Sequence, residues 1–250
     1  SSWSFAKMAE DCPSSRALPN VVLITIFACG GAGFLALVII VVLSRRRIRK
    51  AHRREARELK RRKARVQQLC EGASVLEFPM CCISYLDFRS KGRLITHEEA
   101  RKQQLLHHFD TVPDVQTLAR EKCIVFISHQ WKSADEPDPT GDDWKAAVLA
   151  IECLAATYGR PLDEFVLWID YTSIPQRNRA CQGLSISSLP FYAGFAHFFL
   201  VLCPHVVHGG RTHCFESYQR RGWCRLEQFA RLAMCGVAHM YTCHGTAEQP

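Results

Sequence analysis

Three short motifs that mark common enzyme families are missing from this 250-residue sequence. It has no G-x-x-x-x-G-K-[ST] loop, so nothing indicates a phosphate-cradling ATPase. It has no G-x-S-x-G elbow, and the adjacent Ser128 and His129 do not make a nucleophile–base pair by adjacency alone. The 13 cysteines include no C-x-x-C pair. In a cytosolic domain they are reduced thiols, and we interpret them as small buried hydrophobes.

Charge is absent from residues 21–43, a run of 23 residues. At about 1.5 Å per residue, such a helix crosses the roughly 30 Å hydrocarbon core of a bilayer. A buried core helix would carry a polar stripe, and a signal peptide would have a shorter apolar stretch followed by a cleavage site. This run instead continues into Ser44 and a block of arginines. The sequence therefore predicts a transmembrane helix at 21–43, preceded by an extracytoplasmic tail at 1–20.

Positive charge is concentrated directly after that run. Residues 45–65 hold 13 Lys and Arg against two Glu, whereas the chain from Arg120 onward holds 12 basic and 13 acidic residues. Lys and Arg are retained on the cytoplasmic side, so we expect a single-pass membrane protein with a cytoplasmic C-terminal domain. Residues 44–70 are predicted to form a basic juxtamembrane helix. Its expected partners are the membrane and anionic lipid headgroups, and not nucleic acid.

A helical linker region is expected over residues 71–120. Thr96 and Glu99 have the spacing of a capping box, which predicts a helix through "HEEARKQQLLHHF". Pro113 is expected to end this helix. The region would then connect the juxtamembrane helix to a folded domain at 121–250.

The chain from about residue 121 alternates between apolar, β-branched runs and segments with helical spacing. Such alternation predicts an α/β domain with a parallel sheet covered on both faces. Ligands in such sheets bind outside the carboxyl ends of the strands. The predicted strands are 123–128, 164–171, 197–204 and 237–244, and the predicted helices are 142–159, 188–195 and 220–236.

Chemistry-bearing residues follow these strands. The first strand ends in "SHQW" (128–131) and the second in Asp170. Trp223 and Glu227 are four residues apart on a predicted helix, so they share one face near its start. An indole beside a carboxylate suits a nucleotide, because the ring can stack on a base and the acid can stabilise a developing oxocarbenium ion. The alternative is that Trp223 is a core residue and Glu227 an ordinary surface acid.

Four landmarks together resemble a known family. In order, "CIVFISHQW", "LWIDYTSIPQ", "FFLVLCP" and "RGWCRLEQF" resemble the Toll/interleukin-1 receptor (TIR) domain family over about residues 121–245. "LWIDYTSIPQ" also resembles the heterokaryon-incompatibility domains of fungi. Two departures from the TIR pattern are "SHQW", in place of an acid- or glycine-bearing loop, and an acidic, proline-rich insert at 132–143.

The resemblance implies a flavodoxin-like sheet and signalling by self-association. In the enzymatically active branches it also implies cleavage of NAD at the glycosidic bond, with NAD as a substrate and not as a permanently bound cofactor. The catalytic glutamate of those branches matches Glu227. Segment 170–183 resembles the loop that flanks the nucleotide site and mediates assembly. The pocket residues expected on this basis are Ser128, His129, Trp131, Asp170 and Trp223.

Two functional classes therefore remain open. The first is a TIR-like NAD glycohydrolase. The second is a non-catalytic, membrane-tethered module that recruits protein signalling partners and acts by homotypic assembly, with a homo-oligomer expected in either class. A stripe of small residues in the apolar run is compatible with helix dimerisation. The cluster "CPHVVHGGRTHC" (203–214) contains zinc-type ligands, but its spacing fits no standard knuckle and a polar loop is the preferred interpretation.

Overall fold

The computed structural model describes residues 6–7, 38–50, 57 and 75–245. The chain divides into two compact units, one of residues 1–10 and 68–250 and the other of residues 11–67. In the second unit, residues 38–50 are helical. Within the described ranges, no helix is both long enough and apolar enough to cross a bilayer. Most of the predicted span at 21–43, and of the basic segment at 44–70, lies outside the described residues.

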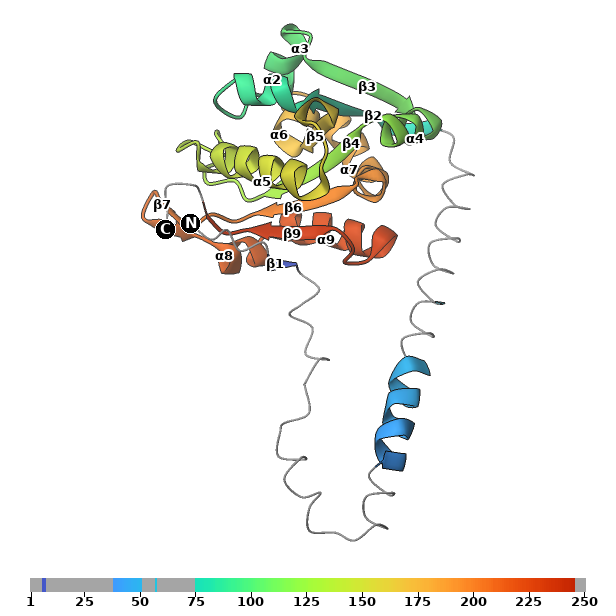
Figure 1. Ribbon diagram of the computed structural model, residues 1–250. Helices are drawn as coiled ribbons and strands as arrows, with labels where there is room; N and C mark the ends of the chain where they lie inside the picture. Colours follow the sequence, from blue (N-terminus) through green and yellow to red (C-terminus); the bar gives the residue numbers. More distant parts are fainter. Residues whose placement is uncertain (1–5, 8–37, 51–56, 58–74, 246–250) are drawn as a thin grey trace. The chain divides into compact units, whose positions relative to one another are not determined.

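A seven-stranded mixed sheet organises the first unit, in the order β1-β9-β6-β4-β5-β2-β3 (Figure 1). Its central strands β4, β5, β6 and β9 are mutually parallel, which confirms the predicted parallel core of an α/β domain. A separate hairpin joins β7 to β8. The strands are β1 (Ala6–Lys7), β2 (Val75–Ser84), β3 (Leu106–Thr111), β4 (Cys123–His129), β5 (Phe165–Ile169), β6 (Phe198–Leu202), β7 (Val206–His208), β8 (Arg211–His213) and β9 (Met240–Cys243).

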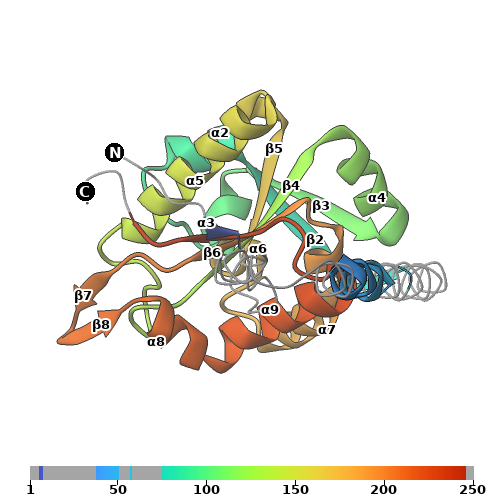
Figure 2. The ribbon, with the colours of Figure 1, turned by 60° about the horizontal axis from the view of Figure 1, so that its bottom comes forward.

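Helices cover both faces of this sheet (Figure 2). On one face the apolar residues of α5 pack with α2, and on the other those of α4, α7 and α9 pack together. A sheet with both faces covered has continuously apolar strands. The helices are α2 (Tyr85–Ser90), α3 (His97–Lys102), α4 (Val112–Glu121), α5 (Asp142–Tyr158), the 3-10 turn η2 (Leu162–Glu164), α6 (Asp170–Ser173), α7 (Arg179–Phe195), α8 (Phe215–Arg220) and α9 (Gly222–Cys235).

The central strands are buried along their whole length, and successive side chains enter opposite cores. On the face covered by α7 and α9, the Phe126 ring stacks between Trp168 and Phe199, with ring centroids 4.3 and 4.9 Å away. Aromatic pairs at this separation add to the stability gained by burying their area. This packing holds the carboxyl ends of β4 and β5 in a fixed relation to each other.

The prediction of a helical linker at 71–120 is wrong for the described residues 75–120. The capping box at Thr96 does begin a helix, since its Oγ1 accepts the Glu99 N–H at 3.1 Å, but α3 ends at Lys102. Gln104 then adopts a left-handed conformation, and the following residues form β3, which pairs antiparallel with β2. Pairing between β2 and β3 thus outweighs the local helical pattern. Strand β2 also pairs antiparallel with β5, and the sheet is therefore mixed rather than all parallel.

Pro113 begins a helix instead of ending one. It lies in the first turn of α4, where its missing N–H costs nothing. Thr111 caps this helix, and Asp114 completes a capping box by accepting the Thr111 N–H at 3.2 Å. The predicted break therefore marks the boundary between β3 and α4.

The pairing of the edge strand β1 concerns the predicted membrane topology, in which residues 1–20 and the domain lie on opposite sides of the bilayer. Ala6 and Lys7 pair antiparallel with Thr242 and Tyr241 of β9. A single span at 21–43 would put a bilayer between Lys7 and β9. This pairing is therefore at odds with the extracytoplasmic placement expected for residues 1–20.

Candidate functional site

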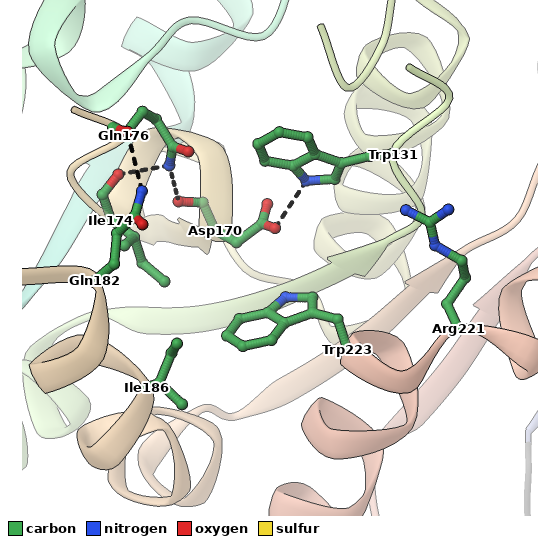
Figure 3. A pocket seen from close by; sticks show the side chains of 8 residues that line it. All are labelled: Trp131, Asp170, Ile174, Gln176, Gln182, Ile186, Arg221 and Trp223. Carbon is green, nitrogen blue, oxygen red and sulfur yellow. Dashed lines mark hydrogen bonds between the residues drawn. The ribbon is translucent and has the colours of Figure 1, made fainter. Parts of the chain in front are cut away.

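A pocket of about 270 Å³ lies where the parallel strands β4 and β5 end and α9 begins (Figure 3). Its volume is near the lower end of ligand pockets, which run from about 300 to 1,000 Å³. Its position is the carboxyl edge of the sheet, where open α/β sheets bind ligands. The lining residues are Trp131, Asp170, Ile174, Gln176, Gln182, Ile186, Arg221 and Trp223.

The Asp170 carboxylate is held in place by neighbours on both of its oxygens. Its Oδ2 accepts the indole N–H of Trp131 at 2.9 Å, and its Oδ1 accepts the backbone N–H of Tyr171 at 2.6 Å. Trp131 also packs edge-on against Tyr171, with ring centroids 5.5 Å apart. Figure 3 shows the carboxylate between the indoles of Trp131 and Trp223. The pocket therefore presents an oriented acid flanked by two aromatic rings.

His129, at the end of β4, contacts Asp170. Its Nε2 lies 3.0 Å from Asp170 Oδ1 and its Nδ1 lies 3.1 Å from Asp143 Oδ2, and the residue is only 1% exposed. Burial by itself lowers the pKa of His129, but Asp170 and Asp143 outweigh it and raise that pKa to about 10. The imidazole is therefore a cation at neutral pH. Its proton stabilises the fold fully below pH 6.5, and this stabilisation is lost as the pH rises through about 10.

A buried lysine continues this network. Lys132 Nζ lies 2.7 Å from Asp138 and 2.8 Å from Asp143. Burial opposes the charge of Lys132, but Asp143 and Asp138 outweigh it and raise its pKa. Asp138 also accepts the backbone N–H groups of Asp143 and Trp144, at 3.1 and 2.8 Å, at the start of α5. The network thus ties the first turn of α5 to the loop after β4.

Glu227 is buried at the carboxyl end of β4, where it accepts a hydrogen bond from Ser128 Oγ. Ser128 Oγ also lies 2.6 Å from the Tyr218 hydroxyl. Burial, followed by repulsion from Asp170, raises the pKa of Glu227 well above its usual range, while Ser128, His129 and Trp223 oppose the shift less strongly. The shift favours the protonated, uncharged form of Glu227 in the folded chain. The Trp223 indole nitrogen is near it but is buried without hydrogen-bond geometry to any described residue.

The predicted site residues are brought together, but in two layers. Glu227 contacts Ser128 at the carboxyl end of β4. The alternative of an ordinary surface acid is wrong, because Glu227 is 1% exposed. Trp131, Asp170 and Trp223 line the pocket, whereas Ser128, His129 and Glu227 are buried and are not among the lining residues.

Several site residues were not singled out from the sequence. Gln176 and Gln182 fall in the segment 170–183 that the family resemblance marks as flanking the site, whereas Ile186 and Arg221 had no such signal. Lys132 and Asp138 belong to the acidic, proline-rich insert at 132–143, which would be expected to lie in solvent, yet their side chains are 1% exposed. The available signal was the pair of aspartates at 142–143, which marks the helix start that Asp138 caps.

The His/Cys-rich segment at 203–214 forms the hairpin of β7 and β8 and its flanks. Across the described part of the chain, no group of three or more His, Cys, Asp or Glu side chains is arranged to hold a metal ion. Cys203 is buried, and burial raises the pKa of its thiol. This cysteine is therefore a protonated core residue.

Comparisons with known proteins assign no family. No family model, no curated protein and no solved structure matches the chain. A function therefore has to be inferred from the pocket and from the motifs that border it.

The protonation of Glu227 predicts a pH-dependent difference in stability between the wild-type chain and Glu227→Gln. Above the pKa of an unfolded glutamate, wild-type Glu227 must take up a proton to fold, which costs about 1.4 kcal/mol for each pH unit over which the two states differ by one proton. Glutamine stays neutral, so the variant should gain on the wild type as the pH rises from 4.5 to 7.5. Urea unfolding at several pH values measures this difference. The exposed Glu77→Gln is the control, and parallel curves for Glu227→Gln and wild type would contradict a raised pKa of Glu227.

Proposed function

We propose that this chain is a membrane-tethered signalling protein whose TIR-like domain binds NAD in the pocket. The domain is proposed to cleave the glycosidic bond between the nicotinamide ring and the ribose of NAD. The observation that carries the proposal is the Asp170 carboxylate, held by the N–H groups of Trp131 and Tyr171 in a pocket at the carboxyl edge of a parallel sheet that Trp223 also lines. The order of the TIR-like motifs along the chain supports the same reaction.

The chemistry requires a negative charge beside the ribose. As the glycosidic bond breaks, its electron pair leaves with nicotinamide and positive charge develops on the ribose ring, until water adds and releases a proton. A preorganised carboxylate stabilises that cation. In this proposal Asp170 supplies the charge, and the indoles of Trp131 and Trp223 pack on the nicotinamide ring. Hydrolysis yields nicotinamide and ADP-ribose.

Glu227 has a supporting role in this proposal, although the resemblance assigns it the catalytic one. It is 1% exposed and outside the pocket lining, so it lacks the access that the reaction needs, and its raised pKa favours the uncharged form. Asp170 has that access. Glu227 instead holds Ser128 at the end of β4, directly before His129.

The experiment is an assay of nicotinamide release from NAD by the full chain reconstituted in lipid nanodiscs. The proposal predicts steady turnover that is lost when Asp170 is replaced. Absence of turnover, both in the free chain and in a chain forced to oligomerise by a fused coiled coil, would reject the enzymatic function.

The membrane anchor is a separate part of the proposal. It rests on the uncharged run at 21–43 and on the basic segment at 45–65, which is proposed to bind anionic headgroups. A single span would place residues 1–20 and the domain on opposite sides, whereas Ala6 and Lys7 pair with β9, so the topology needs its own test. Protease protection of tags at the two ends of the chain in sealed vesicles decides the topology. Tags cleaved on the same side would reject a single span.

One observation favours the second candidate, a non-catalytic assembly module. Helix α9 exposes Leu226, Phe229 and Leu232 at 40, 67 and 41%. Neighbouring exposed apolar residues of this kind often mark protein–protein contacts. A homotypic contact through α9 predicts that Phe229→Asp lowers self-association in sedimentation velocity. Unchanged sedimentation would remove this surface from the proposal.

A further inference from the structure

The buried network behind the pocket is not electrically balanced. Its described members are three carboxylates (Asp138, Asp143 and Asp170) and two cations (His129 and Lys132), joined by contacts of 2.7 to 3.1 Å. All five are 8% exposed or less. One negative charge is therefore in excess, and a buried charge is costly unless an opposite charge pairs with it.

Asp170 is the member of this network that faces the pocket. Asp143 is held by His129 and Lys132, and Asp138 by Lys132 and the first turn of α5, whereas Asp170 has His129 and two neutral N–H donors. Asp170 also lines the pocket, which Asp138 and Asp143 do not. Among the described residues, no ion pair joins Asp170 to Arg221, the cation that lines the same pocket. The uncompensated charge is thus directed at the space a ligand would fill.

Two indoles border this carboxylate. The faces of aromatic rings attract cations, and tryptophan does so most strongly. Trp131 donates its N–H to Asp170, and both Trp131 and Trp223 line the space beside the carboxylate (Figure 3). Rings flanking an anion form a site for an organic cation that is too weakly hydrated to prefer water.

The pocket has a second charged element of opposite sign. Arg221 is exposed and lies across the two indoles from Gln176 and Gln182 in Figure 3. A guanidinium at the start of α9 is suited to a phosphate group. The pocket therefore has an anionic wall and a cationic rim.

We propose that the pocket binds organic cations that carry a phosphate, with the cation between Trp131 and Trp223 against Asp170 and the phosphate at Arg221. Within the proposed function this selects the pyridinium end of oxidised nicotinamide nucleotides. The inference rests on the proposed function for the location of the ligand, but it concerns binding and needs no turnover.

Isothermal titration of the full chain in nanodiscs tests this inference with probes of matched shape. The 1-methylnicotinamide cation is expected to bind about tenfold more tightly than neutral nicotinamide, which has the same ring. Oxidised nicotinamide mononucleotide is expected to bind more tightly again, and its reduced, uncharged ring more weakly. Phosphocholine carries a different cation together with a phosphate. Its binding tests whether the pocket recognises the positive charge or the shape of the nicotinamide ring.

Two variants assign the effect to residues. Asp170→Asn should abolish the preference for 1-methylnicotinamide over nicotinamide. Arg221→Gln should remove only the gain from the phosphate, and the exposed Arg225→Gln on the same helix, which does not line the pocket, should change neither. The comparison of charged and neutral probes on the wild-type chain stands even if a variant fails to fold.

The outcomes separate this inference from the proposed function. Equal affinity for 1-methylnicotinamide and nicotinamide overturns the inference, even if the chain cleaves NAD. Selective binding of the cation without nicotinamide release supports the inference and rejects hydrolysis. Selective binding that survives Asp170→Asn also overturns the inference, because the charge would then be recognised elsewhere.

Discussion

Replacing Asp170 with asparagine is expected to lower the rate of nicotinamide release from NAD by about 10²–10³-fold. Losses of this size follow the removal of one preorganised group that stabilises transition-state charge. The amide keeps the shape of the side chain and an oxygen that can accept the Trp131 N–H, but its NH2 group then faces the Tyr171 N–H and His129, so the folding of the variant is checked by circular dichroism. Steady-state release of nicotinamide by the nanodisc-reconstituted chain gives kcat and KM. The loss should fall mainly on kcat.

The control for this result is Glu227→Gln. Because Glu227 does not line the pocket and its raised pKa favours the uncharged form, a neutral amide of the same size should leave most of the activity intact. The two variants therefore separate two assignments of the catalytic carboxylate. A large loss in Glu227→Gln with an active Asp170→Asn would contradict the role given to Asp170 and restore the one that the TIR resemblance gives to Glu227.

Replacing Lys132 with methionine is expected to lower the free energy of unfolding by about 3–5 kcal/mol, the usual cost of removing one partner from a buried ion pair. The side chains of Lys132 and of its partners Asp138 and Asp143 are 1 to 2% exposed, so water cannot screen the carboxylates that remain. The change also raises the excess negative charge of the network from one to two. Guanidinium unfolding at pH 7, followed by circular dichroism, measures the loss.

The matched control is the exposed pair of Arg160 and Glu164, 3.0 Å apart with side chains 47 and 34% exposed. Exposed ion pairs contribute up to about 1 kcal/mol, so Arg160→Ala should change stability little. Similar small losses in Lys132→Met and Arg160→Ala would show that the network is hydrated rather than buried.

The parallel core was predictable because its strands are buried on both faces and therefore read as continuous apolar runs, such as "CIVFIS". The helix through Trp144 and the helix through Trp223 were predictable from their apolar spacing. Strands β2 and β3 were not, because β3 contains His107, His108 and Asp110 and its side chains are mostly partly or fully exposed. Only pairing with β2, far away in sequence, makes it a strand.

The site was predictable only in part. That the residues following parallel strands meet at one edge of the sheet is a general rule, and it placed Trp131 and Asp170 correctly. The rule does not say which acid faces the pocket. That depends on packing: the α9 helix buries Glu227 against Ser128, while Asp170 follows β5 directly and reaches the pocket. Nor does sequence reveal that Lys132 and Asp138 fold inward, because a charged loop usually lies in solvent.

Fluorine NMR of the full chain labelled with 5-fluorotryptophan tests most directly whether the pocket holds the nicotinamide ring. Resonances assigned by single Trp→Phe replacements report on Trp131 and Trp223, with Trp144 and the core residue Trp168 as internal references. Saturating NAD should shift the signals of Trp131 and Trp223 and leave those of Trp144 and Trp168 in place. Unmoved pocket signals at saturation, or shifts confined to the reference tryptophans, would contradict the account.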